Sequence, residues 1–109
     1  NNFTLFLLTC LEYNICTIDE IIKFILLFQD KLTNFFSNED KIYENDCYVS
    51  NIYTILKSEY VQKNIISHES WNVIKENNKK LQNLNGPGKN NKIKFKLMDI
   101  NDIIDKYKK

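Results

Sequence analysis

The feature that most constrains this chain is a long apolar stripe at helical spacing within residues 17–36. The stripe consists of Ile18, Ile21, Ile22, Ile25, Phe28, Leu32, Phe35 and Phe36. Phe24, Leu26 and Leu27 lie outside the stripe, so the middle of the segment is apolar on nearly every side. A helix of this kind needs neighbours on more than one face. We therefore expect the rest of the chain to pack around one long helix over these residues.

The sequence also indicates where this helix begins. Thr17 and Glu20 have the spacing of a capping box, in which each side chain bonds the backbone amide of the other residue. Asp19 and Glu20 place negative charge near the positive end of the helix dipole. Burial of the apolar stripe contributes roughly 12–24 kcal/mol before conformational entropy is subtracted. We predict a helix that begins after Thr17, ends near Ser37 and is held by packing.

Four further segments show apolar residues at helical spacing. They are residues 3–12, a segment capped by Asp46 that runs to Tyr60, a segment capped by Ser67 that runs to Leu84, and residues 93–107. Gly86-Pro87-Gly88 ends the third of these, because glycine suits the left-handed position after a helix and proline cannot continue one. No window of useful length alternates at period two, so no sheet is expected. We predict an all-α fold of about five helices, arranged as antiparallel hairpins side by side.

The charges nearly cancel over the whole chain but not over its halves. Fifteen Lys and fourteen acids give a net charge of +1, so no global field favours nucleic acid or membrane. Residues 1–60 have a net charge of −5 and residues 61–109 a net charge of +6. This division indicates either a dipolar docking surface or ordinary solvated faces. The chain has no Ala, no Arg and sixteen Asn, as an AT-rich genome would produce, and because Asn is a poor helix former, stability must come from packing.

The cysteines predict neither a metal site nor a secreted protein. Cys10, Cys16 and Cys47 lack Cys-x-x-Cys spacing, and the one histidine, His68, lies far from them. Cys10 is interpreted as a small hydrophobe, and His68 as a histidine of a capping loop, not as a nucleophile partner of Cys47. We expect no cleavable leader, and no apolar run reaches membrane length. We expect an intracellular protein with reduced thiols, in the cytoplasm or in the nucleus or nucleolus, without membrane contact.

No arrangement of residues predicts catalysis. Gly86-Pro87-Gly88 is too short for a phosphate-binding loop and lacks the Lys-Ser or Lys-Thr pair that follows one. Asp99, Asp102 and Asp105 recur along the last segment, where surface ion pairs with lysines explain them better than a carboxylate cluster does. We therefore predict a protein that is not an enzyme, uses no cofactor or metal and takes no small-molecule substrate.

The most basic window spans residues 75–96, with seven Lys and one acid. Lys75, Lys79 and Lys80 are candidate contacts to RNA phosphates, which would give position and salt dependence without reading a sequence. Aromatic residues are not interleaved with these lysines as a single-strand stacking platform requires. RNA contact is therefore the weaker hypothesis for this window.

The last predicted helix also carries a motif. Its apolar face consists of Ile93, Leu97, Ile100, Ile104 and Tyr107. The run from Ile93 to Ile103, IKFKLMDINDI, resembles the closing signature of the middle domain of translation initiation factor 4G and its relatives, which reads basic–Phe–x–Leu–x–Asp–aliphatic–x–Asp–aliphatic and then usually Arg. Ile104 stands in the Arg position, which puts any contact of that Arg in doubt. Looser similarity extends upstream through residues 6–22, Ile55-Leu56-Lys57 and the Gly-Pro-Gly loop.

This resemblance implies both a fold and a role. The fold would be a HEAT-like α-solenoid, with residues 1–109 as a single helical domain that forms the C-terminal part of a longer HEAT-repeat domain. The role would be that of a non-catalytic scaffold in translation initiation or RNA processing. Its implied partner is a DEAD-box RNA helicase similar to initiation factor 4A, with RNA or a ribonucleoprotein as a further partner.

The resemblance also suggests site and core residues. The predicted partner-binding residues are Lys89, Lys92, Lys94 and Lys96, for which a solvated loop and first helical turn are the alternative. The predicted core residues of the motif are Phe95, Leu97, Ile100 and Ile103. Two other functions stay open, namely an unrelated helical adaptor that binds a protein or peptide in a groove between repeats, and a helical domain that contacts RNA.

Overall fold

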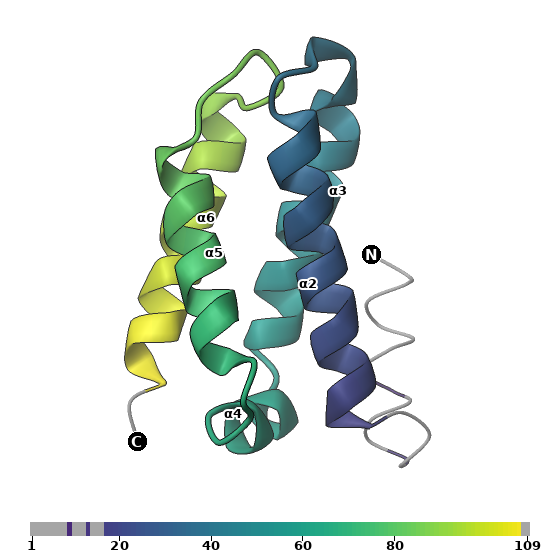
Figure 1. The fold of residues 1–109 in the computed structure, drawn as a ribbon, viewed down its shortest axis with the longest axis vertical. Coiled ribbons are helices and arrows are strands. Elements are labelled where there is room, and N and C mark those ends of the chain that lie inside the picture. Colours follow the sequence, from purple (N-terminus) through teal and green to yellow (C-terminus); the bar gives the residue numbers. More distant parts are fainter. Residues whose placement is uncertain (1–8, 10–12, 14–16, 108–109) are drawn as a thin grey trace.

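The computed structural model describes Thr9, Tyr13 and residues 17–107, and this part of the chain contains helices but no strand (Figure 1). Its α-helices are α2 (Ile18–Phe35), α3 (Ile42–Leu56), α4 (Glu59–Ile65), α5 (Trp71–Asn83) and α6 (Asn91–Lys106), and a 3-10 helix, η1, spans Glu39–Lys41. The all-α prediction is confirmed. The helix predicted over residues 3–12 lies, apart from Thr9, outside the described residues.

The apolar stripe and the capping box of the long helix are confirmed in α2. The Thr17 amide donates to Glu20 Oε1 at 2.9 Å, and the Glu20 amide donates to Thr17 Oγ1 at 3.3 Å. The stripe residues that are fully buried are Ile21, Ile22, Ile25, Phe28, Leu32 and Phe36. Phe24 and Leu26 pack half-buried against the core, while Leu27 is exposed. The helix thus has neighbours on more than one side, as its composition requires.

The segment predicted from Asp46 to Tyr60 is wrong at both ends. Helix α3 begins earlier, at Ile42, because η1 leads directly into it. The cap lies at the start of η1, where the Asn38 side chain accepts from the Asp40 amide. The helix also ends earlier, at Leu56, and the extended backbone of Ser58 starts the separate helix α4. This break lets residues on both sides bury their apolar side chains in the core, among them Ile55, Leu56, Val61 and Ile65.

The starts of the last two helices also differ from the prediction. Helix α5 begins at Trp71 and not after Ser67, because the backbone between α4 and α5 turns at His68: the His68 amide donates to Ile65 and the Trp71 amide donates to the His68 carbonyl. Helix α6 begins at Asn91, two residues early, since Asn90 Oδ1 caps it by accepting from the Ile93 amide at 2.9 Å.

The four longer helices form two antiparallel hairpins that lie side by side (Figure 1). Helix α2 pairs with α3, and α5 pairs with α6. At the interface between the two hairpins, α2 contacts α5 and α3 contacts α6. The two helices of each of these pairs run in the same direction. Helix α4 lies across one end and contacts α2 and α3. The radius of gyration, 13.4 Å, is that of a compact domain.

The Gly86-Pro87-Gly88 loop joins the ends of the two hairpins tightly. The Gly88 amide donates to the Phe36 carbonyl at 2.8 Å, and Asn45 Nδ2 donates to the carbonyls of Gly88 and Phe35. Neither glycine has a left-handed backbone, so that prediction was wrong. Glycine is needed here for space, because a Cβ on Gly86 would overlap the Phe36 carbonyl and one on Gly88 would lie 2.5 Å from two carbonyl oxygens.

Candidate functional site

Lys89, the first of the predicted partner-binding lysines, is engaged within the chain. Its Nζ donates to the carbonyls of Leu81, Gln82 and Leu84 at 2.6–2.9 Å, which lie at the C-terminal end of α5. Carbonyls at a helix end have no partner within the helix, and an ammonium group there also interacts favourably with the helix dipole. Burial lowers the pKa of Lys89, and the nearby charge of Lys94 lowers that pKa further. Lys89 therefore fixes the loop to α5.

Two further predicted lysines contact α3. Lys92 Nζ lies 3.3 Å from Asp46 Oδ2 in an ion pair between the start of α6 and α3. The other carboxylate oxygen of Asp46 is buried and accepts no hydrogen bond from the described residues. Lys96 Nζ lies 4.4 Å from the ring centroid of Tyr53, which Lys57 also approaches at 5.1 Å. Both Lys92 and Lys96 thus help to hold the second hairpin against the first.

Lys94 differs from these neighbours, because it is exposed and its side chain forms no ion pair or hydrogen bond with the described residues. Next to it in the sequence is Phe95, whose exposed fraction is 60%, and one helical turn after Lys94 is Met98, at 47%. The prediction that Phe95 is a core residue is therefore wrong. Leu97 and Ile100 are buried as predicted, and Ile103 is half-buried.

The reason for the exposure of Phe95 is the periodicity of α6. The buried residues of the helix follow one face, and all five members of the predicted face are in the core: Ile93, Leu97, Ile100, Ile104 and Tyr107. Phe95 is two residues from Ile93 and from Leu97, so it lies on the other side of the helix. The exposed apolar pair with Lys94 beside it is called here the α6 patch, and it consists of Lys94, Phe95 and Met98.

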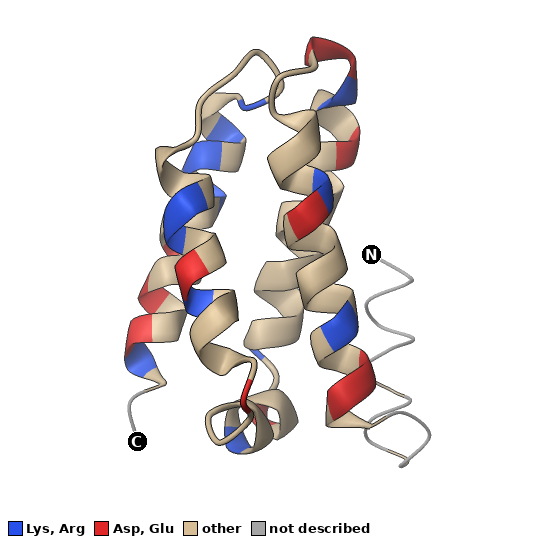
Figure 2. Cartoon of the chain, in the orientation of Figure 1, with Lys and Arg blue, Asp and Glu red and all other residues tan. Residues whose placement is uncertain are grey.

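The charged residues of α6 are unevenly distributed. Figure 2 shows lysines on the first half of α6, and acidic residues followed by Lys106 on the second half; α5 carries lysines and Glu76. Asp99, Asp102 and Asp105 form no ion pair within 4.0 Å with any described lysine, so the predicted surface pairs are not formed there. One reason is that Lys96, which precedes Asp99 by one turn, lies over the Tyr53 ring instead.

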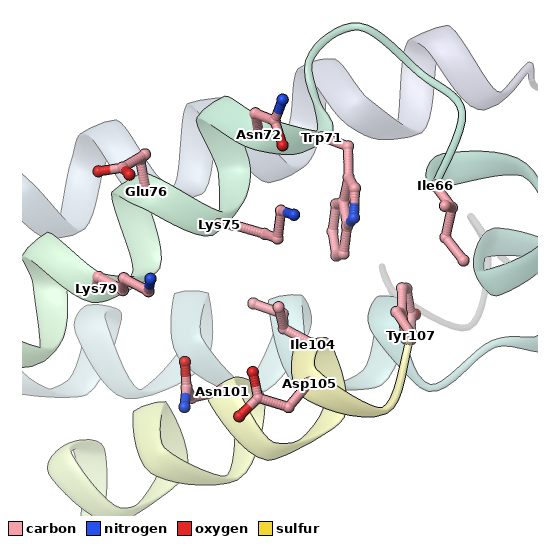
Figure 3. A pocket seen from close by; sticks show the side chains of 10 residues that line it. All are labelled: Ile66, Trp71, Asn72, Lys75, Glu76, Lys79, Asn101, Ile104, Asp105 and Tyr107. Atoms are coloured by element: carbon pink, nitrogen blue, oxygen red, sulfur yellow. The ribbon is translucent and has the colours of Figure 1, made fainter. Parts of the chain in front are cut away.

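A pocket of about 690 Å³ lies along the groove between α5 and α6 (Figure 3). Its apolar end is formed by Ile66, Trp71, Ile104 and Tyr107, and its polar part by Asn72, Lys75, Glu76, Lys79, Asn101 and Asp105. We call this pocket the α5–α6 groove. It contains two of the three lysines predicted to contact RNA, Lys75 and Lys79, whereas Lys80 is exposed and does not line it.

The apolar end of the groove is built on a fixed aromatic pair. The rings of Trp71 and Tyr107 stack with centroids 5.2 Å apart and an interplanar angle of 24°. Tyr107 Oη donates to the Leu56 carbonyl at the end of α3, and burial raises the pKa of Tyr107 above its usual value. The sequence does not predict this groove, because no local pattern shows that α6 ends beside the start of α5.

His68 has the role predicted for it. Its Nδ1 accepts from the Ser70 amide at 3.0 Å, and its Nε2 lies 2.6 Å from Asp19 Oδ1. A nitrogen that accepts cannot carry a proton, so the neutral ring is protonated at Nε2 and donates to Asp19. His68 therefore ties the α4–α5 loop to the first turn of α2, while Cys47 is a free thiol on α3.

Comparison of the chain with protein-family models, with curated protein sequences and with solved structures gives no match. Among the residues the structure describes, no three metal-ligating side chains gather at one place. None of the described helices is both long and apolar enough to cross a membrane. Two features of the described residues that could recognise a partner are the α6 patch and the α5–α6 groove, both on the second hairpin.

Proposed function

We propose that this chain is a non-catalytic docking scaffold that binds a partner protein through the α6 patch. The observation that carries the proposal is the exposure of Phe95 and Met98 beside Lys94, a lysine without an ion pair among the described residues. An exposed aromatic or methionine side chain with a charged rim is typical of protein interfaces. The patch is held rigidly, because Asn90 caps the helix beneath it and Lys89 and Gly88 fix the preceding loop.

The proposed partner is a DEAD-box RNA helicase similar to initiation factor 4A, in translation initiation or RNA processing. Support comes from the resemblance of residues 93–103 to the middle domain of initiation factor 4G. The packing of α2 on α5 and of α3 on α6 is compatible with two HEAT-like repeats, in which equivalent helices of successive hairpins contact each other. The scaffold would hold the two lobes of the helicase and shift the populations of its open and closed forms.

Within the proposed site, Lys94 is the lysine expected to contribute most to binding. Lys92 is exposed at its tip and can turn from Asp46 toward a partner, whereas Lys96 and Lys89 are held over aromatic rings within the chain. A fully buried aromatic anchor often dominates the binding energy of an interface. We therefore expect Phe95 to be more important for affinity than any of the lysines.

The test is a calorimetric titration of a purified DEAD-box helicase with the wild-type chain and with Phe95→Ser and Lys94→Glu. Both variants change exposed side chains, so circular dichroism should show the same helicity as the wild type. Phe95→Ser should weaken binding by about a hundredfold and Lys94→Glu by about tenfold. The matched control is Lys63→Glu on α4, an exposed lysine outside the site that should leave the affinity unchanged. Equal affinities for all four chains would refute the site.

A second candidate function, direct contact with RNA, is favoured by Lys75, Lys79 and Lys80 on α5. It makes a different prediction, because affinity carried by phosphate contacts falls steeply as salt is raised. Titration of a labelled single-stranded RNA at increasing salt distinguishes the two functions. A steep loss of RNA affinity that Lys79→Glu and Lys80→Glu both reproduce would support RNA contact, whereas absence of binding at low salt would exclude it.

A further inference from the structure

The α5–α6 groove lies outside the α6 patch and has chemistry of its own. We propose that this groove binds an acidic peptide segment of a partner protein, with one large apolar residue of the peptide at the Trp71–Tyr107 end and its carboxylates at Lys75 and Lys79. The site goes beyond the proposed function, since it shares no residue with the α6 patch. Its volume of about 690 Å³ is within the usual range for binding pockets.

The apolar end can accept a side chain without rearrangement. Trp71 and Tyr107 are nearly buried, and their positions are fixed by their stacking and by the hydrogen bond from Tyr107 to Leu56. Ile66 at the rim remains 40% exposed, and Figure 3 shows it facing the aromatic pair across the opening. An apolar residue placed between Ile66 and the two rings would cover this exposed surface. A preformed pocket of this kind lowers the entropic cost of binding.

Two lysines on the α5 wall of the groove favour acidic side chains on that side, although Glu76 and Asp105 also line the groove. Lys75 and Lys79 are one helical turn apart on the same wall, and neither forms an ion pair with a described residue. A bound segment could place one acidic side chain at each lysine. The two acidic residues would be one turn apart in a helical segment and two residues apart in an extended one. Lys75 also lies 5.6 Å from the centroid of Trp71, so it joins the charged part of the groove to the apolar end (Figure 3).

The same groove is poorly suited to RNA. Tyr107 stacks on the Trp71 ring and Lys75 lies near it, so the indole offers no open face for a base. Glu76 and Asp105 also line the groove and oppose every anionic ligand. A peptide can offset this repulsion, because its backbone amides can donate to these carboxylates while its acidic side chains meet Lys75 and Lys79. The amides of Asn72 and Asn101 add donors and acceptors for a peptide backbone.

The experiment uses Trp71, the sole tryptophan of the chain, as a reporter within the groove. The probes are fluorescein-labelled synthetic peptides without tryptophan that contain four glutamates around one central leucine or phenylalanine. Control peptides replace the apolar residue by serine or every glutamate by lysine, and a labelled oligouridine tests RNA. Anisotropy of the label gives the affinity, and the emission of Trp71 on addition of unlabelled peptide shows whether the groove is occupied.

We expect the leucine or phenylalanine peptide to bind and to change Trp71 emission, and the serine and lysine peptides to bind at least about tenfold more weakly. Lys79→Glu should weaken the acidic peptide by about tenfold, while its neighbour Lys80→Glu, outside the groove, should change the affinity less than about twofold. Ile66→Ser should remove most of the preference for leucine over serine. These variants alter solvent-accessible side chains, and circular dichroism verifies that they fold.

The proposal is overturned if neither apolar peptide binds, if binding leaves Trp71 emission unchanged, or if Lys79→Glu and Lys80→Glu have equal effects. Tighter binding of oligouridine than of the acidic peptides would assign the groove to RNA instead. Phe95→Ser should leave peptide affinity unchanged. Absence of peptide binding therefore refutes only the groove. Unchanged helicase affinity in Phe95→Ser refutes only the α6 patch.

Discussion

The two hairpins share one core but contribute differently to the molecule. Helix α2 is apolar on most sides and buries a long stripe, whereas α5 buries only Trp71, Ile74, Asn78 and Leu81. The second hairpin carries most of the lysines, the α6 patch and the α5–α6 groove. The difference indicates that the first hairpin supplies much of the apolar area that holds the fold together, while the second carries the two surfaces for which we propose partners.

A polar contact in the interface shows how the weaker hairpin is held. Gln29 on α2 is buried, and its Nε2 donates to the Ile74 carbonyl at 3.1 Å. Its Oε1 accepts from Asn77 Nδ2, also at 3.1 Å. Because an unpaired buried amide lowers stability, these bonds favour this packing of α5 against α2. Together with the Gly86-Pro87-Gly88 loop, these bonds hold the second hairpin against the first at more than one position along the helices.

The largest expected effect tests whether the two hairpins unfold together. Ile25→Ala in α2 and Ile100→Ala in α6 each remove a fully buried side chain, so each should lower the free energy of unfolding by about 3–4 kcal/mol. Urea denaturation followed by circular dichroism should show one transition for both variants. If Ile100→Ala instead produced two transitions, the second hairpin would be an independent unit and the shared core would be refuted.

The next largest effect on stability is expected in the Gly86-Pro87-Gly88 loop, where the two hairpins are in contact. Gly88→Ala would place a Cβ 2.5 Å from the carbonyl oxygens of Phe35 and Asn38, and the backbone must shift to accept it. We expect a loss of about 2–3 kcal/mol in the free energy of unfolding, measured by urea denaturation. Asn85→Ala, at an exposed position of the same loop, is the matched control and should change stability little. Equal stability of both variants would mean that the loop is not tightly packed.

The core faces of the helices could be predicted from the sequence more reliably than the helix ends or the groove. Periodicity correctly assigned the core faces of α2 and α6, because burial repeats with the pitch of the helix. The motif resemblance placed Phe95 in the core, and there it was wrong. Helix boundaries failed at Asp46 and Ser67, since η1 and the turn at His68 depend on local hydrogen bonds that several sequences could make. The α5–α6 groove could not be predicted, because it arises only when Trp71 and Tyr107 meet in the folded chain.

A smaller effect distinguishes a structural lysine from a surface lysine of the second hairpin. Lys89→Met removes the hydrogen bonds from Nζ to carbonyls at the end of α5 and should cost about 1.5 kcal/mol of unfolding free energy. Lys80→Met, on the exposed side of α5, should change it by less than about 0.5 kcal/mol. Denaturant midpoints of the two variants give the comparison. A loss of equal size in both would assign the effect to net charge and not to the bonds of Lys89.

The smallest expected effect is a pH dependence at the contact between Tyr107 of the second hairpin and Leu56 of the first. Because burial raises the pKa of Tyr107 above 10.0, its value in the unfolded chain, the neutral phenol is favoured by folding. Its contribution to stability is therefore complete below pH 10 and is lost as the pH rises further. Tyr107→Phe removes both the hydrogen bond and this titration. The variant should be less stable than the wild type by about 1 kcal/mol at neutral pH.

Above pH 10 that difference should shrink, because the Tyr107 phenol of the wild type ionises when the chain unfolds and the variant has no such phenol. All other side chains are the same in both chains, so subtraction of the two denaturation curves isolates Tyr107. Tyr43→Phe, at a highly exposed tyrosine on the first hairpin, is the matched control and should follow the wild type at every pH. A difference between Tyr107→Phe and wild type that stayed constant as the pH rose past 10 would show that the Tyr107 hydroxyl is solvated, and the link from α6 to the end of α3 would have to be abandoned.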